Sequence, residues 1–179
     1  MTDTLHRILP QVQKPARYVG GEYNQIVKDK KNVDVRVAFC FPDTYEIGMS
    51  NIGMRILYGL MNEMPGVWCE RVFAPWGDME AEMRKYAIPL YALESHDPVK
   101  AFDLIAFTIG YEMSYTNILN MLELSCVPLL AREREGLENI VFAGGVCAVN
   151  PEPLADFIDF FSIGEGEEIT KEIIDCYRQ

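Results

Sequence analysis

The chain lacks the cysteine spacings that hold a zinc ion or an iron–sulfur cluster. Its five cysteines, at positions 40, 69, 126, 147 and 176, form no C-x-x-C or C-x-x-x-C-x-x-C group. This pattern excludes a metal site built from neighbouring cysteines. An odd number of cysteines scattered through apolar segments is typical of reduced thiols buried in a cytoplasmic protein, and we predict that location.

Positive charge is also scarce, with 16 lysines and arginines against 27 acidic residues and a net charge of −11. Such a chain repels phosphate backbones and anionic lipids, so we expect no nucleic-acid or membrane contact. No apolar stretch approaches the roughly 20 residues of a membrane span, and no signal-peptide core begins the chain. The two histidines, His6 and His96, stand without a second ligand at helical or turn spacing, so we interpret both as surface residues.

What the sequence does contain is a series of short apolar runs that alternate with helical patterns after residue 32. Strands are predicted at 33–41, 68–73, 89–93, 104–108, 140–143 and 160–163, and helices at 51–64, 78–86, 115–122 and 167–177. Asn51 or Ser50 can cap the first helix, and Ser114 the third. This alternation predicts an α/β domain with a flavodoxin-like, doubly wound parallel sheet and helices on both faces. Residues 1–32 have too few periodic apolar positions for a core element, so we predict an extended N-terminal arm and one domain, 33–179.

Glycines mark the ends of the last two predicted strands. Gly144 and Gly145 follow the run 140–143, and Gly164-Glu165-Gly166 follows 160–163. Ligands of open α/β sheets bind beyond the carboxyl ends of the strands, and glycine lets the backbone approach them closely. We therefore predict a binding rim at this edge, with the two glycine pairs facing the ligand.

Two further segments belong to the same edge of the predicted sheet. The loop after the first strand contains Asp43, Thr44, Tyr45 and Gly48, and Thr108 ends the strand 104–108. The structural alternative for Asp43 is a turn in which its carboxylate accepts nearby backbone N–H groups. The carboxylates around Glu165 complement a helix start, and one of them could orient a ligand.

Two common functions of this fold do not fit. The glycines 164 and 166 do not form a dinucleotide fingerprint, because Ile169 occupies the position of its third glycine. A phosphate-accepting receiver domain needs an acidic residue where Thr108 stands, and no lysine ends the last strand.

The chain resembles the N-terminal, cobalamin-binding-type domain of radical S-adenosylmethionine (SAM) enzymes, and most of all a functionally uncharacterised subfamily of them. The segments that carry the resemblance are 15–18 and 20–22, Phe41 to Asn51, Phe73 to Trp76, Tyr111 to Asn117, Asn150 to Asp156 and Ile163 to Glu167. The resemblance implies an accessory domain that holds a corrinoid at the rim, over a catalytic barrel in the same protein. The four-iron cluster and SAM are expected only in that barrel, which we expect to follow Gln179.

One residue departs from the related cobalamin domains whose D-x-H-x-x-G motif supplies a cobalt ligand. Here the motif reads Asp43-x-Tyr45-x-x-Gly48, which implies cobalamin binding without histidine ligation. A cofactor-free docking module of a radical SAM protein is the alternative, and a flavin-binding domain is a third hypothesis that only the fold supports. We expect no catalysis by this chain alone.

Overall fold

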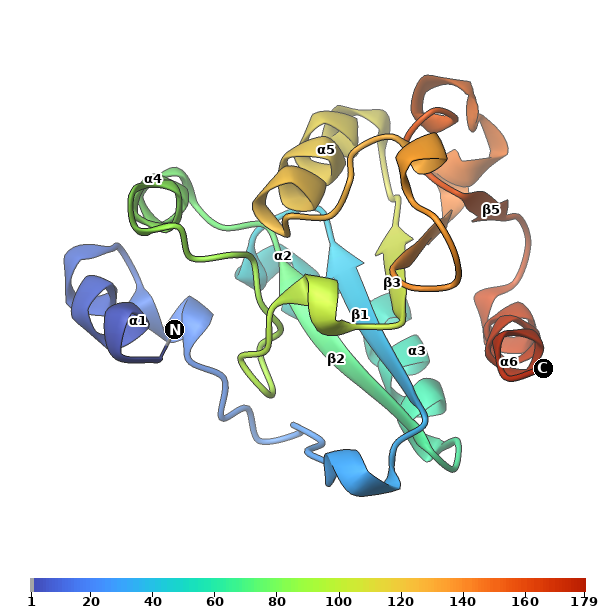
Figure 1. The fold of residues 1–179 in the computed structure, drawn as a ribbon, viewed down its shortest axis with the longest axis horizontal. Helices are drawn as coiled ribbons and strands as arrows, with labels where there is room; N and C mark the ends of the chain where they lie inside the picture. The colour runs from blue at the N-terminus through green and yellow to red at the C-terminus, as the bar shows by residue number, and fades with distance from the viewer. Residues whose placement is uncertain (1) are drawn as a thin grey trace.

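The computed structural model describes residues 2–179, and a five-stranded parallel sheet forms its centre (Figure 1). The strands are β1 (Val35–Phe41), β2 (Val67–Phe73), β3 (Leu104–Thr108), β4 (Ile140–Gly144) and β5 (Phe160–Ser162). Their order in the sheet is β2-β1-β3-β4-β5, with every pair parallel. This is the flavodoxin-like order, whose direction of winding switches between β1 and β3, so the predicted fold class is confirmed.

Helices cover both faces of the sheet. They are α1 (Thr2–Ile8), α2 (Tyr45–Ser50), α3 (Ile52–Glu63), α4 (Gly77–Tyr86), α5 (Tyr115–Leu124) and α6 (Gly166–Tyr177). One core joins α3 and α6 to alternate strand residues such as Val37, Ala106 and Phe142. The opposite core joins α1, α4 and α5 to the strand residues in between, such as Ala38. The two-residue period of a strand thus divides the buried side chains between the two faces.

Local signals explain where the helices begin. The side chain of Asn51 accepts the N–H of Met54 at 2.9 Å and so caps α3, as predicted. Ser114 occupies the position before α5, but its hydroxyl donates to the carbonyl of Tyr111 and caps nothing. None of the helices within residues 2–179 is both long and apolar enough to cross a bilayer.

The predicted strand at 89–93 is wrong. Residues 90–93 are buried, but the only pairing there is an isolated antiparallel bridge between Tyr91 and Pro98. The N–H of Leu90 donates to the carbonyl of Leu124, the last residue of α5, and that of Leu93 donates to the carbonyl of Arg71 in β2. This segment therefore satisfies its backbone on two different elements, and burial alone gave it the appearance of a strand.

The N-terminal arm also differs from the prediction in its first half. Helix α1 and the turn after it bury Leu5, Ile8 and Leu9 in the core shared with α4 and α5. Residues 20–29 have no helix or strand, as predicted for an arm. The expectation of no core element in residues 1–32 was wrong for its first part, where Leu5, Ile8, Leu9 and Val12 have the i, i+3, i+4, i+7 spacing of one helix face.

The second half of the arm contacts the start of β2, at the outer edge of the sheet. The arm is the blue segment that leads from α1 to β1 (Figure 1). The indole N–H of Trp68 in β2 donates to the carbonyl of Ile26 at 3.0 Å. The Lys28 ammonium donates to the carbonyls of Asn62, at 2.6 Å, and Val67, at 2.5 Å. Burial lowers the pKa of Lys28. All residues of β2 are buried, although β2 is an edge strand.

The burial of the cysteines and histidines agrees only in part with the prediction. Cys40, Cys69 and Cys147 are buried and free, whereas Cys126 and Cys176 are exposed. His6 is exposed, as predicted. His96 is half-buried, packs edge-on against Tyr91, and has a buried Nε2 without a hydrogen-bond partner.

A carboxylate on α2 ties the arm to the sheet. Glu46 accepts hydrogen bonds from Arg17 at 2.9 Å and from Lys14 at 3.1 Å. The Arg17 guanidinium, with help from Lys14, lowers the pKa of Glu46 to about 2. Its ordinary value is 4.5, so the contact stabilises the arm above that pH and is lost as the pH falls toward 2.

We therefore expect limited proteolysis near residues 14–17 to accelerate between pH 4.5 and pH 2, with an acid-active protease and before the far-ultraviolet signal changes. In Glu46→Gln the same cleavage should already be fast at pH 6. Glu82→Gln, which loses only a pair with Lys85 inside α4, is the matched control. Equal protection of Glu46→Gln and the wild type at pH 6 would contradict the role of this contact.

Candidate functional site: a cavity at the carboxyl ends of β3, β4 and β5

A cavity of about 210 Å³ lies between α3, α6 and the sheet. The sheet side is formed mainly by Phe39, Ala106 and Phe142, and the helix side by Leu57, Met61 and Thr170. The remaining lining residues are Gly53, Phe107, Thr108, Gly144, Gly145, Ser162, Gly164, Gly166 and Glu167. An apolar cavity of about 150 Å³ takes up benzene, so the space here has room for a larger planar group.

The upper end of this cavity is a row of three residues, one from each strand. Thr108 is paired in register with Gly144, and Gly144 with Ser162. Thr108 and Gly144 come two residues after Ala106 and Phe142, which pack on the side of α3 and α6. Because side chains alternate along a strand, the row faces α3 and α6 as well. One level below, the rings of Phe142 and Phe160 stack with centroids 5.1 Å apart. Gly144, in the middle of this row, lines the cavity and presents no side chain to it.

The two glycines at the end of β4 have different roles. A Cβ on Gly144 would lie 3.5 Å from the carbonyl of Ser162, which is an ordinary contact. A Cβ on Gly145 would lie 2.7 Å from the carbonyl oxygen of Ile109, and Gly145 has φ +105. Both glycines line the cavity, and Gly145 is in addition required by the chain's own backbone, so whether both face a ligand stays a prediction. Gly164 has φ +122 with open space around it.

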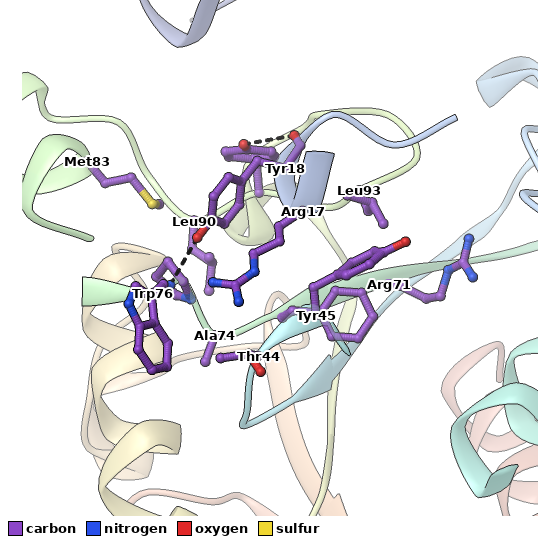
Figure 2. A pocket seen from close by; sticks show the side chains of 13 residues that line it. Arg17, Tyr18, Thr44, Tyr45, Arg71, Ala74, Trp76, Met83, Leu90 and Leu93 are labelled. Carbon is purple, nitrogen blue, oxygen red and sulfur yellow. Dashed lines mark hydrogen bonds between the residues drawn. The ribbon is translucent and has the colours of Figure 1, made fainter. Parts of the chain in front are cut away.

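The segment after β1 lies apart from this cavity. Thr44 and Tyr45 line a different cavity, of about 30 Å³, together with Arg17 and Trp76 (Figure 2). That volume holds no more than two or three water molecules and no cofactor. The sequence prediction of a single rim thus joined residues that the structure separates into two places.

The Tyr45 hydroxyl is engaged by the arm. It donates to the Glu22 carboxylate at 2.5 Å, and the ring packs edge-on against Phe73. Figure 2 shows the hydroxyl directed toward the side of Arg71 and away from Trp76. Burial, with the contact to Glu22, raises the pKa of Tyr45 to about 12. Tyr45 is therefore a protonated structural phenol.

Asp43 and Gly48 also have structural roles. The Asp43 carboxylate accepts the N–H of Thr44 at 2.7 Å, as in the turn considered from the sequence, and the hydroxyl of Tyr111 at 3.4 Å. A Cβ on Gly48 would overlap the ring of Phe73, so this glycine allows α2 to pack closely on β2.

An apolar rim lies at the same edge of the sheet as the cavity. It consists of exposed side chains from the loops after β3, β4 and β5: Tyr111, Met113, Val146, Val149 and Ile163. Met113 is 80% exposed and Val146 72%. Large apolar side chains that gather at one end of a monomer, rather than singly, mark a surface that contacts another molecule.

Charged groups contribute little to this site. Glu165 is exposed, precedes α6 and forms no side-chain cap. It does not line the cavity, where Glu167 is the one ionisable side chain among the described residues. Among the residues described here, no group of three His, Cys, Asp or Glu side chains could hold a metal ion.

Several lining residues were not predicted from the sequence. Ser162 and Thr170 are polar but only 8% and 9% exposed, and each interrupts an apolar pattern, of a strand and of a helix face. That interruption was the available signal. Leu57 and Phe142 gave none, because a residue that lines a cavity has the same pattern as one in a filled core.

Comparison with known proteins identifies the domain type. Residues 53–179 match the family described as radical SAM proteins, N-terminal. A protein of Methanocaldococcus jannaschii, named only as uncharacterized, is 26% identical over 142 residues, which is 77% of this chain and 26% of that protein. The chain thus spans about a quarter of the length of this relative. No solved structure matches it. The chain belongs to the family of N-terminal domains of radical SAM proteins.

Proposed function

We propose that this domain binds a corrinoid, or a related flat cofactor, at the carboxyl ends of β3, β4 and β5. The observation that carries the proposal is the cavity of about 210 Å³ that lies at the same edge of the sheet as the apolar rim. In this arrangement a planar base of the cofactor enters the cavity past Gly144, and the macrocycle covers Met113 and Val146. The family supplies the context, since it is described as the N-terminal part of radical SAM proteins.

The residues at the rim fit a corrinoid that has no protein imidazole on cobalt. His6 lies in α1, and His96 lies in the connection between α4 and β3, and neither lines the cavity. Tyr45 cannot substitute, because its hydroxyl is bound to Glu22 and protonated at neutral pH. The role proposed for Tyr45 and Gly48 is therefore to hold α2 in place, and that of Gly144, Gly164 and Gly166 is to leave space for the ligand.

The chemistry of such a system belongs to the cofactor and to the catalytic domain. We propose that SAM and a four-iron cluster are bound by that domain, in the same protein, and that this chain supplies position and shields the cofactor from water. Its three buried free thiols agree with the proposed cytoplasmic location.

A cofactor-free docking module remains the second hypothesis, because an exposed apolar rim would also suit direct contact with a catalytic domain. A flavin at the same edge is a third. Unlike the first hypothesis, the docking module gives no reason for a cavity behind the rim.

Absorption spectroscopy separates these hypotheses. We expect the chain purified from cobalamin-fed cells, or titrated with hydroxocobalamin, to show a corrinoid spectrum at one equivalent. The paramagnetic resonance of the reduced cobalt(II) form should show no nitrogen splitting from the protein. A flavin spectrum, or the absence of any binding, would overturn the proposal. Nitrogen splitting that disappears in His96→Ala would overturn the histidine-free assignment alone.

A further inference from the structure

Three hydroxyl groups surround the cavity, in a lining that is otherwise mostly apolar. Thr108 and Ser162 flank Gly144 at the ends of β3 and β5, and Thr170 projects from α6. Neighbouring strands lie about 4.8 Å apart, so the two strand hydroxyls are separated by roughly 10 Å, the width of a fused two-ring heterocycle.

None of these hydroxyls has a partner within the protein. The side chains of Thr108, Ser162 and Thr170 form no hydrogen bond to any described residue; Ser162 and Thr170 are more than nine-tenths buried, but the three oxygens remain accessible from the cavity. By contrast, the buried hydroxyl of Ser125 is satisfied within the protein, because it donates to the Met121 carbonyl at 2.6 Å. A ligand that enters the cavity displaces water from the three accessible hydroxyls, and it gains affinity if it replaces the hydrogen bonds of that water.

The charge of the lining restricts the ligand further. Glu167 is the one ionisable side chain there, and no lysine or arginine reaches the cavity. A phosphate or carboxylate would therefore find no counter-charge, while an uncharged group would meet apolar walls from Leu57 and Phe142. Since a hydroxyl both donates and accepts, the best ligand carries ring nitrogens and amino groups on its edge.

Resting on the proposed function, we propose that Thr108, Ser162 and Thr170 make the cavity selective among corrinoids for an uncharged nucleotide base with a hydrogen-bonding edge. Adenine offers several edge nitrogens and an amino group. Dimethylbenzimidazole presents two methyl groups where adenine presents its amino group and ring nitrogens. A phenolic base has no ring nitrogen. The order of affinity is therefore the adenine-bearing corrinoid, then cobalamin, then the phenolic form, with cobinamide, which has no base, the weakest.

Equilibrium titration of the full chain with these four corrinoids tests the proposal. Each satisfied hydroxyl contributes a factor of about 2 to 10 in affinity, so we expect the adenine form to bind about tenfold more tightly than cobalamin. In the triple variant Thr108→Val, Ser162→Ala, Thr170→Val this preference should disappear, while cobinamide binds as before. Thr116→Val, at an exposed position of α5, is the control and should retain the preference. The melting temperature of each variant establishes that it is folded.

The outcomes separate this inference from the proposed function. If all four corrinoids bind equally, the base does not use the cavity and the inference is overturned, whereas corrinoid binding stands. If no corrinoid binds but free adenine shifts the amide resonances of residues 142–144 and 162–164, the cavity is a site for a free base, and both the proposed function and the selectivity among corrinoids are overturned. If neither a corrinoid nor free adenine binds, both are overturned.

Discussion

Gly144→Val is expected to abolish corrinoid binding in a protein that remains folded. The new Cβ meets only an ordinary contact 3.5 Å from Ser162, and valine is favoured in strands. Its two methyl groups project toward the cavity, which the proposed base enters. We expect at least a hundredfold loss of affinity for the wild type's preferred corrinoid, about 2.7 kcal/mol, with an unchanged or higher melting temperature.

Gly145→Ala provides the matched comparison one residue further on. Its Cβ would lie 2.7 Å from the Ile109 carbonyl, at a φ of +105. Such strain costs about 1–3 kcal/mol, so here we expect the stability to fall. Titration and thermal unfolding of both variants give the result. If Gly144→Val still binds the corrinoid tightly, the cavity is not the binding site. If both variants lose stability equally, Gly144 is a structural glycine too.

Glu94→Gln is expected to destabilise the chain by about 3–5 kcal/mol, the typical cost of removing one partner from a buried ion pair. Arg71 in β2 is 3% exposed, and its Nε donates to Glu94 at 2.7 Å. The other Glu94 oxygen accepts the backbone N–H of Arg71, also at 2.7 Å. The guanidinium lies over the ring of Tyr58, so no solvent replaces the lost carboxylate.

Urea denaturation measures this effect, and a second variant isolates its cause. Replacing both partners, as in Arg71→Met with Glu94→Leu, leaves no buried charge and should recover most of the loss. Glu80→Gln, which breaks a more exposed pair with Arg84 in α4, should change the stability by less than about 1 kcal/mol. A loss below 1 kcal/mol in Glu94→Gln would show that water reaches Arg71 in the folded protein.

The sheet could be predicted from the sequence because its strands are short apolar runs with clear ends. The runs at 104–108 and 140–143 are buried on both faces, and Pro42 ends the first strand. The segment 89–93 shows the limit of this reasoning, since its N–H groups find partners on α5 and β2. Burial is visible in a sequence, but the choice of a hydrogen-bonding partner distant in the chain is not.

The site was predictable to the same extent. Glycines at strand ends indicated an edge of the sheet that has a cavity, and Thr108, Gly144, Gly145, Gly164 and Gly166 line it. Tyr45 could not be placed, because the short helix α2 turns its ring toward Phe73 and Glu22. The contact with Glu22 depends on the path of the arm, which has no periodic pattern to read.

The contacts of Ile26 and Lys28 with the start of β2 bear on where a shortened form of this domain should begin. Strand β2 is an edge strand, and the arm covers only its start, through the Trp68 indole and the carbonyl of Val67. Further along, Asn62 satisfies the backbone of Cys69, and Leu93 and Glu94 satisfy that of Arg71. An uncovered edge strand is a template for pairing with another chain. A fragment that starts at residue 33, the boundary drawn from the sequence, would therefore expose the start of β2 to such pairing, while the rest of the edge stays blocked.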